Sequence, residues 1–271
     1  MTSSLKVGCQ TFTWEMLGDA WRGTADDLLA AIAQASYSGI EITDTMIGSY
    51  ADRPEPFAKA LAGHGLTLVA FACGSRSGFT EEAQVETDLA MVERAIAFAS
   101  AFPGAHVSFG SATVMSPGPR DAKFATAARF YNEAAARGRK AGVPVAVHPS
   151  SHHDTLLFTR ADYDQLFARL SPEVGWIPDT GHILRGGHDI LDTLATFRDR
   201  IRYLHLKDVD AAGTWQMLGA GTCDTAAVVT SVQAAPHFNG WLVLEEESEE
   251  AGRDPSAAVA RNRETMRRYG A

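Results

Sequence analysis

Four residues of types that bind divalent metals follow short apolar runs in the second half of this chain. The runs at residues 143–147, 174–177, 201–204 and 241–244 lead into His148, Asp179, His205 and Glu245, in that order. Mixed imidazole and carboxylate ligands suit Mn²⁺, Co²⁺, Fe²⁺, Zn²⁺ or Mg²⁺, and the spacing does not choose among these ions. The pattern predicts one metal site assembled from four successive strand ends.

Other chemically capable side chains occupy comparable positions. Glu41, Lys207 and a histidine from residues 148–153 are candidates for a general base, and His106 also falls beside an apolar run. Trp14, with Phe12, and Trp215 are candidates to stack on the apolar face of a sugar. Structural roles stay open for two of these residues: Lys207 could form an ion pair with Asp208 or Glu245, and Glu41 could be a buried structural carboxylate. We expect the acidic run at 246–250 to be solvated.

Bulk composition restricts the class of protein. The 271 residues are 45% hydrophobic and 21% charged, which is ordinary for a globular enzyme-sized domain. The net charge of −9 argues against a nucleic-acid partner. The three cysteines lack metal-site spacing, and the N-terminus lacks the apolar core of a signal peptide. The sequence also has no apolar run long enough for a membrane span, so we expect a cytoplasmic protein without membrane segments.

Strand and helix signals alternate along the whole chain. The first four strands are expected at 5–9, 39–42, 66–72 and 105–109, and the other four end at the predicted ligands. Helices are expected at 25–36, 55–62, 80–100, 124–139, 160–170, 189–197, 225–235 and 255–269. Eight strand–helix units without a break in composition predict a single (β/α)8 barrel domain over residues 1–271. Gly219-Ala220-Gly221 follows no strand directly, so no dinucleotide site is predicted.

Several segments together resemble the sugar phosphate isomerase/epimerase superfamily of xylose isomerase-like barrels. They are QTFTWEM at 10–16, GIEIT at 39–43, DTGH at 179–182, HLKD at 205–208 and GWLVLE at 240–245. HLKDV followed by a Trp215…LGAGT loop and then GWLVLEEE is most similar to inosose dehydratase-like members. The resemblance implies His148, Asp179, His205 and Glu245 as metal ligands, with manganese the first choice. It also implies a substrate contact for His182. His152 is a further candidate for substrate binding, and His152 or His153 could take the place of His148 as a metal ligand because both lie close to it.

The resemblance implies a metal-dependent lyase. The metal would polarise a ketone and a neighbouring hydroxyl, a base would take the α-proton, and an acid would protonate the departing β-hydroxyl in an enediolate-type β-elimination on a keto-cyclitol or keto-sugar. Ketose 3-epimerases of this superfamily carry a glutamate at the fifth strand end, where this chain has His148. That difference favours a dehydratase over an epimerase.

Three other functions remain as alternatives. The first is a ketose isomerase or epimerase, whose product would keep the mass of its substrate. The second is a metal-dependent endonuclease, which the net charge disfavours and an absence of DNA binding would exclude. The third is a sugar-binding barrel without turnover. We expect a small-molecule partner, and although such barrels can form homo-oligomers through helix faces, no sequence feature demands one.

Overall fold

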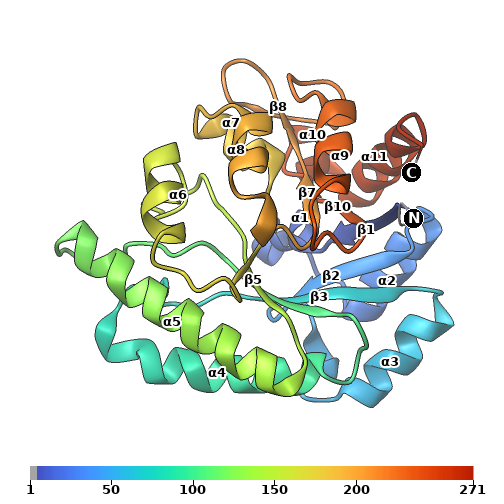
Figure 1. The fold of residues 1–271 in the computed structure, drawn as a ribbon. Helices are drawn as coiled ribbons and strands as arrows, with labels where there is room; N and C mark the ends of the chain where they lie inside the picture. The colour runs from blue at the N-terminus through green and yellow to red at the C-terminus, as the bar shows by residue number, and fades with distance from the viewer. Residues whose placement is uncertain (1–4, 271) are drawn as a thin grey trace.

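The computed structural model describes residues 5–270, and a curled parallel sheet forms its centre (Figure 1). The hydrogen-bonded strand order is β6-β5-β4-β3-β2-β1-β10-β7. These eight strands are β1 Lys6–Gln10, β2 Gly39–Thr43, β3 Thr67–Cys73, β4 His106–Phe109, β5 Val145–Val147, β6 Gly175–Trp176, β7 Leu204–Leu206 and β10 Trp241–Leu244. All eight predicted strands are present, and the predicted barrel class is confirmed.

The ring closes between its two outer strands. Beside β6 and β7, two isolated parallel bridges join the segments: Trp176 with Ile201 and Asp179 with His205. Two backbone hydrogen bonds accompany them. The Arg202 amide donates to the Trp176 carbonyl with an N···O distance of 3.0 Å, and the His205 amide donates to the Pro178 carbonyl at 2.9 Å. Few contacts therefore complete the barrel at this position.

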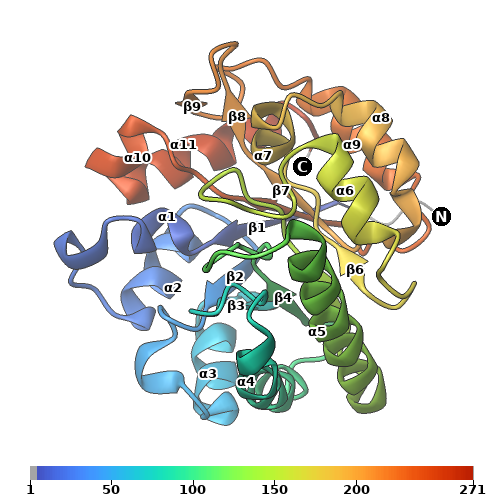
Figure 2. The same cartoon turned by 90° about the vertical axis from the view of Figure 1, so that its left-hand side faces the viewer.

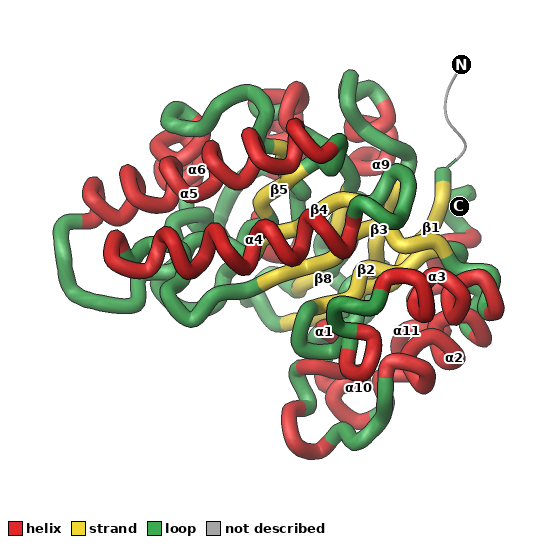
Figure 3. The backbone as a smooth tube through the Cα atoms, turned by 90° about the horizontal axis from the view of Figure 1, so that it is seen from below, coloured by secondary structure: helices red, strands yellow, loops and turns green. Residues whose placement is uncertain are grey.

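Helices surround the sheet, as Figures 1 and 2 show. Those near the expected ranges are α2 Ala25–Gln34, α3 Pro54–Gly63, α4 Val85–Ala99, α5 Arg120–Ala141, α6 Arg160–Phe167, α8 Ile190–Thr196, α9 Thr225–Gln233 and α11 Pro255–Arg267. A capping box of Thr24 and Asp27 begins α2, with each side chain bonding the other's backbone amide. Helices α4 and α5 lie side by side on one outer face (Figure 3).

Several short elements above the strand ends were not predicted. They are the helices α1 Phe12–Glu15, α7 Thr180–Arg185 and α10 Glu249–Arg253, and an antiparallel hairpin that pairs β8 Asp208–Val209 with β9 Trp215–Gln216. Each follows the carboxyl end of a strand. They are too short to carry a clear periodic apolar pattern, because one or two turns offer few buried positions.

Alternation along each strand separates two apolar layers. Leu204 and Leu206 of β7 pack into the large core between sheet and helices, as do Leu242 and Leu244 of β10. Tyr203 and its barrel-lining neighbours form a second buried group inside the ring: Val69, Ala70, Ala146, Ile177, Trp241 and Val243. Because alternate side chains point to opposite faces, His205 points inward above Tyr203. No helix among residues 5–270 is both long and apolar enough to span a membrane.

Candidate metal centre and active-site cavity

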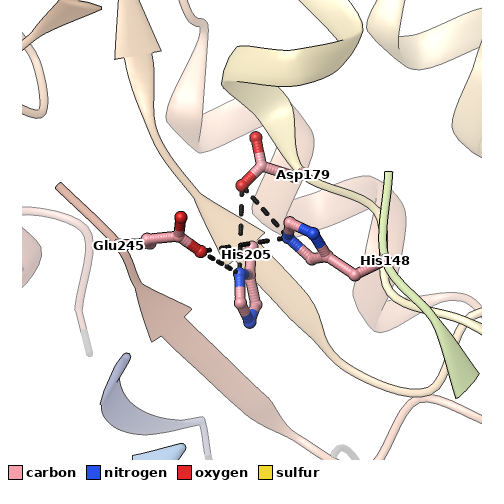
Figure 4. A group of neighbouring side chains, drawn as sticks. All are labelled: His148, Asp179, His205 and Glu245. Carbon is pink, nitrogen blue, oxygen red and sulfur yellow. Dashed lines mark hydrogen bonds and ion pairs between the residues drawn. The ribbon is translucent and has the colours of Figure 1, made fainter. Parts of the chain in front are cut away.

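The four predicted ligands converge at the carboxyl ends of the last strands (Figure 4). His205 Nδ1 lies 3.0 Å from Glu245 Oε2 and 3.9 Å from Asp179 Oδ2. His148 Nε2 lies 3.5 Å from the same Asp179 oxygen and 3.9 Å from the same Glu245 oxygen. One ligating atom from each of the four residues therefore faces a common point.

Two atoms of this group lack hydrogen bonds within the described part of the chain. His148 Nε2 and Asp179 Oδ2 are both buried, and neither has a hydrogen-bond partner. Burying a polar atom without a partner is costly, so such atoms usually mark a bound ion or water. Two imidazole nitrogens and two carboxylate oxygens form a donor set that first-row divalent ions accept. The residues fit a metal ion, and these four would hold it.

Asp179 owes its orientation to α7. Its Oδ1 accepts the His182 amide proton at 2.8 Å and caps the helix, which leaves Oδ2 turned toward the other ligands. Gly181 in the first turn is required by space, because a Cβ there would lie 2.5 Å from the Trp215 ring and 2.8 Å from Lys207 Cβ. The Asp-Thr-Gly-His spacing is thus explained by a capped helix packed tightly against the hairpin.

His205 is oriented from behind by a carboxylate. Glu41 Oε2 lies 2.8 Å from His205 Nε2 and also accepts the Tyr203 hydroxyl proton at 2.8 Å. Such a contact fixes the ring and turns Nδ1 toward the other three ligand residues. Burial alone would lower the pKa of His205, but the charges of Glu41 and Glu245 raise it to about 10. This surplus of negative charge favours binding of a cation.

Lys207 forms the ion pair with Glu245 that the sequence left open. Its Nζ lies 2.8 Å from Glu245 Oε1 and also contacts Glu247 Oε1. Burial opposes the ammonium, but the two carboxylates outweigh it and raise the pKa of Lys207 above its usual value. The other suggested partner, Asp208, instead accepts backbone amides of residues 209, 219, 221 and 223. The contacts with Glu245 and Glu247 favour the charged form of Lys207.

A polar pair, His182 and His152, lies beside the metal ligands. Ser151 donates its backbone amide to His182 Nδ1 at 3.0 Å, and Lys207 Nζ, also a donor, lies 3.3 Å from His182 Nε2. Burial, followed by the charge of Lys207, holds the pKa of His182 well below its usual value. His152 Nε2 lies 2.9 Å from Glu247 Oε2, and its side chain is about one-third exposed.

A cavity of about 890 Å³ opens over this group. Glu41, His148, His152, His182 and Glu245 all line it. The predicted contacts Trp14 and His106 do not: the Trp14 side chain is buried in the core, and His106 packs against Tyr203 inside the barrel. Trp215 lies beside the cavity, with its ring 5.3 Å from that of His182, and Phe12 lines the wall.

The acidic run contains a cavity residue that was not predicted. The expectation that 246–250 is solvated is wrong for its first three residues, because Glu246 is 3% exposed, the Glu247 side chain 8% and Ser248 2%. Glu246 accepts the Asn262 amide at 2.6 Å, whereas Glu247 lines the cavity. Glu247 follows Glu245 by two residues, and alternation beyond the strand end could have placed both on one side.

Comparison with known proteins assigns the family. The family model described as xylose isomerase-like TIM barrel matches residues 29–269. The chain belongs to this family, as its eight-stranded barrel and strand-end site lead one to expect.

Individual relatives are more distant. An inosose dehydratase of Lacticaseibacillus casei is 27% identical over 138 residues, a match that covers 44% of this chain and only 45% of that protein. A structure of IOLI protein with a bound zinc atom aligns with a TM-score of 0.77 at 14% identity, covering 97% of this chain and 96% of that one. A structure of L-ribulose 3-epimerase aligns with a TM-score of 0.75 at 19% identity, covering 98% and 94%.

Proposed function

We propose that this chain is a metal-dependent lyase that removes water from a keto-cyclitol or keto-sugar. The observation that carries the proposal is the buried pair of His148 Nε2 and Asp179 Oδ2, which have no hydrogen-bond partner among the described residues and lie beneath the cavity. The partial match to an inosose dehydratase supports the substrate class. His148 at the fifth strand end supports elimination, because a two-glutamate proton exchange would need a carboxylate there.

The ion held by His148, Asp179, His205 and Glu245 would supply a Lewis acid for a substrate carbonyl. His152 is our candidate for the base among residues 148–153. Its Nε2 faces the Glu247 carboxylate, which leaves Nδ1 as the basic nitrogen. His152 takes the proton from the α-carbon and returns it to the departing β-hydroxyl, so that water leaves and a carbon–carbon double bond forms. His182, which lines the cavity beside the ligands, contacts the substrate.

Product analysis tests the lyase proposal. Purified protein is incubated with keto-inositols and 3-keto-sugars, and products are followed by mass and by enone absorbance in the ultraviolet. We expect loss of water, abolished in Asp179→Ala. His152→Gln should lower turnover on the order of 100-fold or more with metal content retained, whereas His153→Gln, its matched neighbour, should have little effect. A product of unchanged mass would overturn the lyase and support an epimerase.

The isomerase or epimerase alternative has one specific observation in its favour. The L-ribulose 3-epimerase structure aligns with nearly the whole chain, although at 19% identity this likeness concerns the fold. Exchange of solvent deuterium into recovered ketose, without loss of water, would distinguish this reaction from elimination.

A further inference from the structure

Lys207 lies inside a second group of potential metal ligands. His152, His182 and Glu247 each offer one ligating atom, and these three atoms lie within 4.8 Å of one another. The Lys207 ammonium contacts Glu247 Oε1 and lies 3.3 Å from His182 Nε2. Its side chain is only 1% exposed, so the ammonium is fixed among these groups. A positive charge therefore already occupies this part of the site.

The surroundings of the ammonium resemble those of a bound cation. Glu245 contacts Lys207 Nζ through Oε1 at 2.8 Å and His205 Nδ1 through Oε2 at 3.0 Å. One carboxylate thus connects the first ligand group to the ammonium, as a bridging carboxylate connects the ions of a two-metal site. The Trp215 ring covers another side, with its centroid 4.5 Å from Nζ.

Charge counting agrees with this arrangement. The two ligand groups contain the carboxylates of Asp179, Glu245 and Glu247. The Glu41 carboxylate beside His205 makes four negative charges, against which one divalent ion in the first group and the Lys207 ammonium supply three positive ones. A second divalent ion beside an intact Lys207 would leave an excess of one positive charge in a buried region, which is unfavourable, whereas two ions without Lys207 would be balanced.

We propose that the Lys207 ammonium takes the place of a second divalent metal ion and so restricts the centre to one ion. Removing it converts His152, His182 and Glu247 into a second metal site. The inference concerns metal stoichiometry and is independent of which reaction the cavity performs.

Metal counting tests the proposal. Wild type, Lys207→Ala and Lys207→Ser are saturated with Zn²⁺, separated from free ion and analysed for zinc per chain, with circular dichroism to check folding. We expect both Lys207 variants to hold one ion more than wild type. Lys140→Ala removes a lysine from the exposed end of α5 and should match wild type. A folded Lys207 variant without the extra ion, or a wild type that binds two ions, overturns the proposal.

Double variants locate the extra ion. Lys207→Ala with Glu247→Ala should lose it, whereas Lys207→Ala with Asp179→Ala should lose the ion of the first group and keep the new one. If neither Lys207 variant folds, His152→Ala in the otherwise native protein tests whether His152 binds metal while Lys207 is present. We expect its zinc content and zinc affinity to equal those of wild type. A drop there would show that His152 already binds metal and would contradict the proposal.

Discussion

Asp179 combines two roles because a carboxylate has two oxygens. Oδ1 caps α7 through the His182 amide, and Oδ2 is buried near His148 without a hydrogen bond among the described residues. The cap places His182 three residues later at the position that donates this amide. The short spacing that makes these residues conspicuous in sequence is therefore local helix geometry, and the chemistry follows from where the helix begins.

Two substitutions of Asp179 separate its roles. Asparagine keeps an oxygen for the cap but loses the charge, so Asp179→Asn should weaken metal binding by at least about tenfold while largely preserving stability. Asp179→Ala should also lose the cap, so its free energy of unfolding should be about 1 kcal/mol lower than that of Asp179→Asn. Zinc titration and urea unfolding of the metal-free proteins measure the two effects. Equal stability of both variants would contradict the cap.

Glu41 gives a second test at this scale. If its main role is to hold His205, Glu41→Gln should weaken metal binding by about 10- to 100-fold although Glu41 is not a ligand. If it is the general base, metal affinity should be unchanged and only turnover should fall. Tyr203→Phe is the control, because it removes one donor to Glu41 and leaves His205 unaltered. Competition with a chelator measures the affinity.

The ligand residues could be predicted because each follows an apolar run, whereas their partners could not. Glu247 was missed because the glutamate-rich stretch at 245–250, broken only by Ser248, is typical of a solvated surface. Only the fold shows that Glu246 and Glu247 turn inward. Trp14 was expected at a sugar-binding surface because it lies near a strand end. In the structure a four-residue helix turns it into the core.

At the scale of elements, the strands were predictable and the short pieces above them were not. Continuous apolar runs identify strands that are buried on both faces. Helix α7 and the β8–β9 hairpin are held by contacts distant in sequence: the Thr180 hydroxyl donates to the Lys207 carbonyl at 2.6 Å and accepts its amide at 2.9 Å. These contacts exist only once the barrel has brought neighbouring strand ends together.

Gly181 tests the packing of α7 against the hairpin. A methyl group there meets Trp215 and Lys207 Cβ, so Gly181→Ala should lower the free energy of unfolding by about 1–3 kcal/mol. Gly63, at the end of α3, has open space where a Cβ would lie, and Gly63→Ala should be neutral or slightly stabilising. Urea unfolding of both variants checks this. Similar effects from both would show that α7 can shift to accept the methyl group.

At the scale of the whole molecule, burial inside the barrel favours the neutral form of a histidine. Burial, with the charge of Arg202 adding to it, lowers the pKa of His106 from 6.5 to about 4. Between these values the unfolded chain binds the proton and the folded chain does not, so stability rises with pH across this interval. The change amounts to about 3 kcal/mol.

His106→Phe should remove this part of the acid sensitivity. The aromatic ring can still pack against Tyr203, and the buried Nδ1, which has no hydrogen bond among the described residues, is eliminated. Urea unfolding of both proteins at about pH 4.5 and pH 7, with chelator present, gives the difference in pH dependence. The stability gap between the two pH values should be smaller in the variant; an equal gap would place the acid sensitivity elsewhere.

The two bridges between the β6 and β7 segments have a consequence for how folding and ligand capture are related. One of them joins Asp179 to His205, so the seam of the barrel runs through two residues of the ligand group. An ion bound to both side chains would link the β6 and β7 segments, which two isolated bridges join. Because the ion binds only when the two segments are together, it also disfavours their separation. In the metal-free protein we expect the barrel to open first between β6 and β7.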